Sequence, residues 1–217
     1  MIIIDHTVAP SVEQWKAVIR GARNPFNSWD KSDSKEEFVP LWDEELFKLG
    51  DKDKTLLNRL ANAGDDHGKF MRMLPVITDI KADFTFFKQL DTYKIGTVSD
   101  SCSTMHTILN EPFKMEDFNA SSNDSKRLLQ FTIEGLNKLR ERYFKTSDDD
   151  EMKKIWKAVI ENLPMSYMQK RTWSTNYQVL RRIYNARKNH KLSDWHDFCA
   201  WIESLPYARS LILGEME

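Results

Sequence analysis

The segment Leu90–His106, LDTYKIGTVSDSCSTMH, is the stretch from which we infer the fold of this chain. It combines a tyrosine and a lysine with five hydroxyl side chains after Lys94, a thiol and a histidine. A run with so few apolar side chains buries poorly, so it predicts a turn-rich segment that faces a ligand or reverses the chain. We therefore expect the candidate site here.

Length and composition favour a soluble, globular protein. The chain has 217 residues, enough for one large domain with a buried core, and it is 41% hydrophobic with 12% aromatics, which argues against disorder. No run approaches the roughly 18 apolar residues that cross a bilayer. The apolar start MIII is followed at once by Asp5 and His6, so we interpret it as a first strand rather than a signal peptide.

The two cysteines predict an intracellular protein. Cys102 and Cys199 are too few for a disulfide framework, and in a chain without a secretory signal they favour free thiols in a reducing cytoplasm. Cys102 and His106 are four residues apart, but two ligands are too few for a zinc site, so we expect no metal. A Cys-His nucleophile pair is the alternative, although no orienting third group is evident.

The charge pattern leaves two interpretations open. A formal net charge of −1 argues against a nucleic-acid partner. From residue 163 to residue 193, however, the chain has seven basic residues and no acidic one. This run is either a solvated helix face or a phosphate-binding surface. Its members are Lys170, Arg171, Arg181, Arg182, Arg187, Lys188 and Lys191.

The N-terminal region begins with a helix signal. Ser11 and Gln14 have the spacing of a capping box, which predicts a helix over Val12–Arg20 that ends at Gly21. The next stretch, ARNPFNSWDKSDS, is expected to be a loop. Its two aromatics tether the loop or, in the alternative, it closes over a site as a lid.

Short elements are predicted through the middle of the chain. Helical spacing at 41–49 and at 56–61 indicates two short helices. The aspartate pair before His67 can cap a third helix that runs through Met73, and Val76–Ile80 is expected to form a strand.

Longer helices are predicted in the second half. Apolar residues recur at helical spacing over 129–143 and over 152–163, with an acidic run before the second stretch at its positive end. Met165–Thr172 is expected to be a strand that leads into a helix capped by Ser174 or Thr175, and one more helix follows.

These elements together predict an α/β (α+β) fold, in which a helix-rich single domain surrounds a small central sheet. Within this single domain we assign an N-terminal strand, helix and loop to residues 1–50, the core to 51–205 and a C-terminal tail to 206–217.

The central segment resembles the signature of the flavin-dependent thymidylate synthase (ThyX-like) family, in which an Arg-His-Arg triplet precedes a Ser-x-Arg. In one register the triplet falls on Tyr93, Lys94 and Ile95, and the later serine is Ser103. Met105 stands where that family has its last arginine.

A second register is also open. It places the triplet on residues 92–94 and matches Gln89 to a glutamine that the family has just upstream. In either register the signature is degenerate, because its arginines are missing here.

The C-terminal block resembles the same family. A Leu-Pro turn leads through a strand into a helix that carries Asn176, Leu180 and Arg187 at comparable positions, and Trp195 matches an aromatic of the following helix. His67 lies where the family has a histidine before the signature. The resemblance runs from about His67 to residue 201 and extends to phage and bacterial relatives of the family.

The resemblance implies a homotetramer that binds FAD and deoxyuridylate (dUMP) between subunits. The family transfers a methylene group from a folate to the uracil C5 and then a hydride from the reduced flavin. The residues that the resemblance assigns to flavin are His67, Tyr93, Lys94 and Asn176. Those that it assigns to the nucleotide, mainly to its phosphate, are Ser101, Ser103, Arg171, Arg182 and Arg187. No catalytic residue is assigned.

Three functions follow from these observations, and the sequence leaves them open. The first is a FAD-dependent methyltransferase of the thymidylate synthase type. The second is a protein that binds a nucleotide without turnover, because the signature arginines are missing. The third is a protein-interaction protein on the same scaffold, for example one that a phage encodes and that acts on a host partner.

Overall fold

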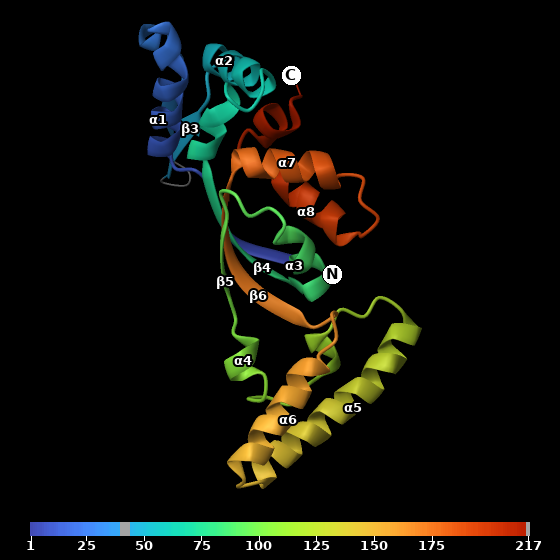
Figure 1. Ribbon diagram of the computed structural model, residues 1–217. Coiled ribbons are helices and arrows are strands. Elements are labelled where there is room, and N and C mark those ends of the chain that lie inside the picture. Colours follow the sequence, from blue (N-terminus) through green and yellow to red (C-terminus); the bar gives the residue numbers. More distant parts are fainter. Residues whose placement is uncertain (40–43, 216–217) are drawn as a thin grey trace. The chain divides into compact units, whose positions relative to one another are not determined.

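The computed structural model describes residues 1–39 and 44–215 (Figure 1). The Cα positions divide the chain into two compact units. Unit 1 comprises residues 1–3, 80–92 and 100–171, and unit 2 comprises residues 4–79, 93–99 and 172–217. The expectation of a single domain stays a prediction.

The strands form a four-stranded sheet and a separate hairpin, and the helices outnumber them, which confirms the α+β prediction. In the larger sheet the strand order is β1 (Ile3–Val8), β4 (Pro75–Asp83), β6 (Met168–Asn176) and β5 (Val98–Ser101). The hairpin pairs β2 (Lys35–Val39) with β3 (Glu44–Lys48), antiparallel, with Lys35 opposite Lys48.

In unit 2, α7 (Tyr177–Arg187) packs against three other helical elements. These are η3 (Gly68–Met73), α8 (Asp194–Glu203) and the π-helical turn η5 (Arg209–Leu213). Helix α1 (Val12–Arg23) packs against α2 (Asp51–Asn62) and η3. Two short turns, η1 (Asn24–Phe26) and η2 (Trp29–Lys31), follow α1.

The predicted capping box at α1 is confirmed. Ser11 Oγ accepts a hydrogen bond from the Gln14 amide, and Gln14 Oε1 accepts one from the Ser11 amide. The predicted end of this helix at Gly21 was wrong, because α1 continues to Arg23. Burial of Ala22 and Arg23 holds the last turn in place and outweighs the low helix propensity of glycine.

Three other local predictions were wrong. Residues 44–48 form strand β3 rather than a helix, and the rest of that predicted helix before residue 44 lies outside the described residues. The helix expected before Met73 is the 3₁₀ element η3, with His67 at its N-cap and no side-chain cap. Helix α7 is capped by Asn176, because β6 continues through the serine and threonine that were expected to cap it.

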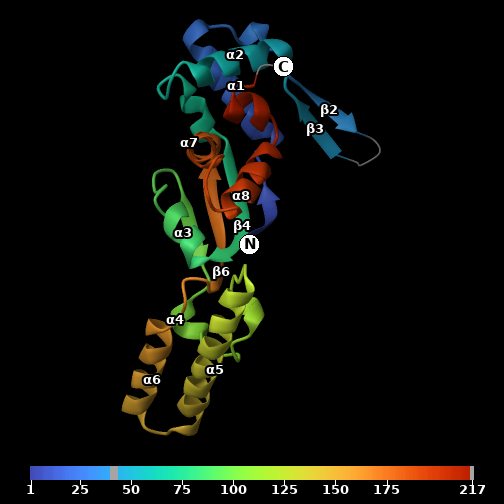
Figure 2. The ribbon, with the colours of Figure 1, turned by 90° about the vertical axis from the view of Figure 1, so that its right-hand side faces the viewer.

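Unit 1 is built on the helical pair α5 (Asn123–Lys145) and α6 (Asp149–Glu161), which lie side by side (Figure 2). Its remaining helical elements are α3 (Phe84–Leu90), α4 (Thr104–Thr107) and η4 (Met115–Asp117). Asp148 accepts hydrogen bonds from the first amides of α6, so the acidic run stabilises that helix as predicted.

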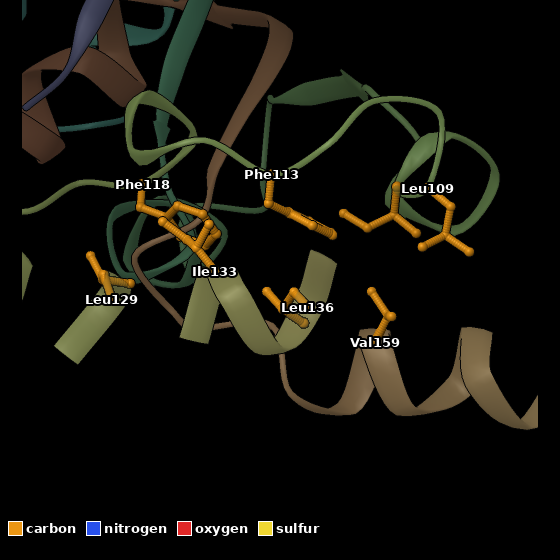
Figure 3. Close-up of a cluster of buried hydrophobic side chains, with 8 residues drawn as sticks. Leu109, Phe113, Phe118, Leu129, Ile133, Leu136 and Val159 are labelled. Carbon is orange, nitrogen blue, oxygen red and sulfur yellow. The ribbon is translucent and has the colours of Figure 1, made fainter. Parts of the chain in front are cut away.

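The apolar stripes predicted for α5 and α6 form the core of unit 1. Figure 3 shows Ile133 and Leu136 of α5 close to Phe113 and Phe118. The buried cluster consists of Ile108, Leu109, Phe113, Phe118, Leu129, Ile133, Leu136 and Val159. Apolar side chains at helical spacing pack together to leave water, which is why periodicity located the four members on α5 and α6. The other four, from residues 108–118, were not predicted.

Candidate functional site

The loop Tyr93–Ser99 of unit 2 lies against the start of α7. Gly96 has a φ of 78°, a left-handed conformation that glycine adopts without strain. Asn176 accepts a hydrogen bond from the Val179 amide as the helix cap, and its Nδ2 donates to the Gly96 carbonyl at 3.4 Å. A Cβ at Gly96 would lie 2.8 Å from Asn176 Nδ2, so the close approach requires glycine.

A second contact joins the same loop to the end of α7. Arg187 Nε donates a hydrogen bond to Tyr93 Oη at 3.0 Å. The guanidinium lies 5.7 Å from the centre of the Tyr93 ring and 4.7 Å from that of Trp195, which is fully buried. Cation–π attraction therefore fixes the position of the charge as well as that of the tyrosine.

The middle of the loop faces solvent. Lys94 is exposed, and the exposed fraction is 83% for Ile95 and 71% for Val98. The loop, which is attached at Tyr93 and at Gly96, therefore presents one lysine beside two exposed apolar side chains. Such a surface can take a ligand with a flat apolar part and an anionic group.

A cavity of about 420 Å³ lies elsewhere in unit 2, within the size range of small-molecule sites. Its walls come from α1, η1, α2 and η3 and are mainly apolar, and its polar side chains include an imidazole, a lysine, an arginine and an aspartate. The lining residues are Gly21, Ala22, Pro25, Leu60, Asp66, His67, Lys69, Phe70, Arg72 and Met73. This composition suits an anionic ligand with an apolar body.

Three of the residues selected from the sequence attach the loop to α7, at two separate places. Asn176 contacts Gly96 at the start of the helix, and Arg187 contacts Tyr93 at its end. His67 lines the cavity, while Lys94 and Arg182 are exposed side chains of the loop and of α7. The cavity walls that α1 contributes were not found from the sequence, because no spacing rule links them to residues some 40 positions later.

In unit 1, Arg171 is held by its neighbours. Its Nε donates to Gln169 Oε1 at 2.8 Å, its Nη1 donates to Asp91 Oδ1 at 2.8 Å, and its guanidinium lies 4.0 Å from the centre of the Phe87 ring. These contacts within the fold explain the position of the Arg171 side chain, so we interpret it as a structural residue.

The two serines assigned to the nucleotide also belong to unit 1. Ser101 is exposed at the end of β5. Ser103 caps α4, where its Oγ accepts a hydrogen bond from the His106 amide at 3.2 Å. The hydroxyl of Ser103 therefore already has a role in the local fold.

Burial shifts the pKa of three titratable groups of unit 2, of which Cys199 is buried and Arg181 and Tyr184 are half-buried. Burial lowers the pKa of Arg181, whose guanidinium donates to Asn62 Oδ1 and to the Leu211 carbonyl. Burial, with a hydrogen bond to Glu203, raises the pKa of Tyr184 to about 12. Burial likewise raises the pKa of the Cys199 thiol to about 11.

The cysteines are both free thiols, as predicted, with Cys102 exposed and Cys199 buried. Cys102 is fixed through its backbone, which donates to the Lys170 carbonyl and accepts from Gln169 Nε2. In the part of the chain that the structure describes, no helix is long and apolar enough to span a membrane.

Fold and surface together define a helix-rich α+β protein whose loop on α7 carries aromatic and cationic side chains. Over nearly its whole length the chain has the fold of flavin-dependent thymidylate synthases. It is similar to thymidylate synthase X from Helicobacter pylori, solved with FAD and dUMP, with a TM-score of 0.67 and 19% identity over 97% of this chain and 96% of that one. A second structure of that enzyme with FAD and dUMP gives a TM-score of 0.68 and 18% identity over 97% of both chains.

No protein-family model matches this chain, and no curated protein matches it in sequence. The likeness at this level of identity shows the fold.

Proposed function

We propose that this protein binds FAD and a pyrimidine deoxynucleotide on its thymidylate synthase-like scaffold. The observation that carries the proposal is the fold match over 97% of the chain to an enzyme solved with both ligands. In this chain the loop Tyr93–Ser99 and the cavity around His67 supply the matching chemistry, because each offers apolar surface beside positive charge.

The residues present are of the chemical types that a flavin nucleotide needs. Its flat ring needs apolar walls, which Phe70 and Met73 provide in the cavity and Tyr93 and Ile95 provide on the loop. Its diphosphate needs cations, and those on offer are Lys94 at the loop, with Lys69 and Arg72 at the cavity. When bound, FAD supplies hydride chemistry, and the protein residues bind and orient it.

Binding without turnover is the second candidate, and the signature positions favour it. In the first register, two of the positions that carry arginine in the resembled family hold Ile95 and Met105, which are exposed apolar residues here. The guanidinium of Arg171 is already bonded to Asp91 and Gln169. Both facts reduce the number of arginines that can hold a phosphate or stabilise charge during a reaction.

The first test is a visible absorbance spectrum of the purified protein, followed by calorimetric titration with FAD and with dUMP. Flavin bands or saturable binding support the proposal. A flat spectrum with no binding of either ligand would leave the fold as a scaffold for protein interaction. If the ligands bind, an assay of thymidylate formation with a reduced folate donor separates the enzyme from the non-catalytic binder.

Lys94→Ala is the clearest variant, because the side chain is exposed and its loss costs the fold little. Loss of one charge-assisted hydrogen bond to a phosphate should weaken binding about tenfold or more. Lys157→Ala, an exposed lysine of α6 in unit 1, is the matched control and should bind as the wild type does. Equal affinity of the two variants would move the site away from the loop.

A further inference from the structure

Three potential metal ligands converge on the first strand of unit 2. Asp5 and His6 lie on β1 and Asp79 lies on the neighbouring strand β4, and one ligand atom from each lies within 4.8 Å of the others. His6 Nδ1 is 3.1 Å from Asp5 Oδ1 and 3.3 Å from Asp79 Oδ2. The cluster is separate from the cavity and from the loop on α7.

The backbone explains how neighbouring residues reach the same point. Successive side chains of a strand normally point to opposite faces. His6 has a φ of 52°, in the left-handed region, which interrupts this alternation. Asp5 and His6 can therefore both approach Asp79 on the adjacent strand.

One threonine orients a carboxylate ligand, and a second holds the backbone of another ligand residue. Thr172 of β6 donates to Asp79 Oδ1 at 2.6 Å, so the other oxygen is the one that faces His6. Thr78 donates to the Asp5 carbonyl at 2.9 Å and fixes the backbone that carries the other carboxylate. Hydrogen bonds of this kind to the ligands are typical of metal centres, where they set ligand direction.

The spacing of the donor atoms fits a metal ion. Ligands about 2.0–2.2 Å from a metal in tetrahedral or octahedral geometry lie roughly 2.9–3.5 Å apart. Both measured separations from His6 Nδ1 fall in this interval. The side chain of Asp79 is 18% exposed and that of His6 is 75% exposed, so an ion can enter and water can complete its coordination.

From this geometry we infer that Asp5, His6 and Asp79 form a site for a divalent transition-metal ion such as Zn²⁺. One imidazole nitrogen with two carboxylate oxygens suits Zn²⁺, Co²⁺ or Ni²⁺ better than Mg²⁺ or Ca²⁺, which prefer oxygen ligands alone. The sequence predicted no metal, because Cys102 and His106 are only two ligands. The present cluster was not found, since Asp79 is too distant in sequence for any motif spacing to join it to the other two.

The test is calorimetric titration of the full chain, without a histidine tag, with Zn²⁺. Wild type should bind one ion per chain, and His6→Ala and Asp79→Asn should each weaken binding at least tenfold. Thr172→Val keeps all three ligands and should weaken binding about tenfold to a hundredfold, the usual effect of losing an orienting hydrogen bond. His196→Ala removes an exposed histidine of α8 and should leave binding unchanged.

Co²⁺ gives a second measurement on the same proteins, because its visible absorption reports protein ligands directly. Wild type should develop bands that saturate at one equivalent and that disappear on addition of Zn²⁺. The inference is overturned if wild type binds no stoichiometric Zn²⁺, or if His6→Ala binds it as tightly as His196→Ala does. In that case the three side chains contact one another without holding an ion.

Discussion

Two loops of unit 2 are held in different ways. The segment 24–34 is closed by a buried ion pair between Arg23 and Asp53, with Nη2 and Oδ1 2.6 Å apart. The loop Tyr93–Ser99 is attached to α7 through an asparagine and through Arg187 with its aromatic partners. The first attachment is enclosed by protein, whereas the second leaves the middle of its loop in solvent.

The two attachments also differ in hydrogen bonding. Asp53 is fully buried, and its Oδ2 accepts from the backbone amides of Asp33 and Ser34 and from the hydroxyls of Ser32 and Ser34. Arg23 also donates to the backbone carbonyls of the segment it closes. A carboxylate enclosed in this way has no access to a ligand, so this cluster is structural. The loop on α7, by contrast, carries an exposed lysine, Lys94.

Asp53→Asn should have the largest effect of the changes considered for the two loops. It leaves the buried Arg23 charge without its carboxylate, and breaking a buried pair of this kind costs about 3–5 kcal/mol. We expect the free energy of unfolding, measured by urea denaturation, to fall by this amount. Asp30→Asn changes an exposed aspartate of the same segment and should have little effect. Equal stability of the two variants would show that the segment does not depend on the pair.

The pH dependence of stability should sharpen the contrast. Burial acts to raise the pKa of Asp53, but the hydrogen bonds from Ser34, Ser32 and Arg23 outweigh it and hold the pKa below its ordinary value. A carboxylate with a lowered folded-state pKa contributes stability that is present above its unfolded-state pKa, about 3.9, and is lost as the pH falls through the folded value.

The stability difference between wild type and Asp53→Asn should therefore be constant above about pH 5 and shrink below about pH 4. Urea denaturation curves at a series of pH values measure it. A difference that grows toward acid pH would contradict the assignment of Asp53 as an ionised, hydrogen-bonded carboxylate.

The two loops also show what sequence reasoning could reach. Composition marked a polar turn within Leu90–His106, and the resemblance selected Tyr93 for the flavin and Arg187 for the nucleotide. That these two side chains contact each other was not predicted. The aromatics Phe26 and Trp29 were expected to tether the first loop. Each is 51% exposed, but Phe26 does contact α2, because the Arg59 guanidinium lies 5.4 Å from the centre of its ring. The buried closure of the loop is a charge pair 30 positions apart in sequence, which was not predicted.

In the rest of the fold too, local patterns predicted elements but not the contacts between distant residues. The long helices α5 and α6 were predicted because apolar spacing repeated over many residues fits only a helix. Strand β3 was missed, since a few apolar residues fit a helix and a strand equally well. Contacts such as Asp79 with His6 depend on which strands become neighbours, and no local pattern records this.

Gly96→Ala is the smallest of the changes and acts only on the second loop. An L-residue in the left-handed conformation costs about 1–2 kcal/mol, and the new Cβ would lie 2.8 Å from Asn176 Nδ2, which must move. We expect the free energy of unfolding to fall by about this amount, less than for Asp53→Asn. Affinity for FAD should fall more than stability does, because the displaced loop carries Lys94.

Gly135→Ala is the matched control, because Gly135 lies within α5 and an added Cβ there meets no atom within 4 Å. It should raise the free energy of unfolding by about 0.5–1 kcal/mol, since alanine favours a helix more than glycine does. If Gly96→Ala were as harmless as Gly135→Ala, the loop would not be held against Asn176. The loop Tyr93–Ser99 would then be held no more firmly than an ordinary surface turn. It would differ even more from the segment 24–34, which the buried Asp53 closes.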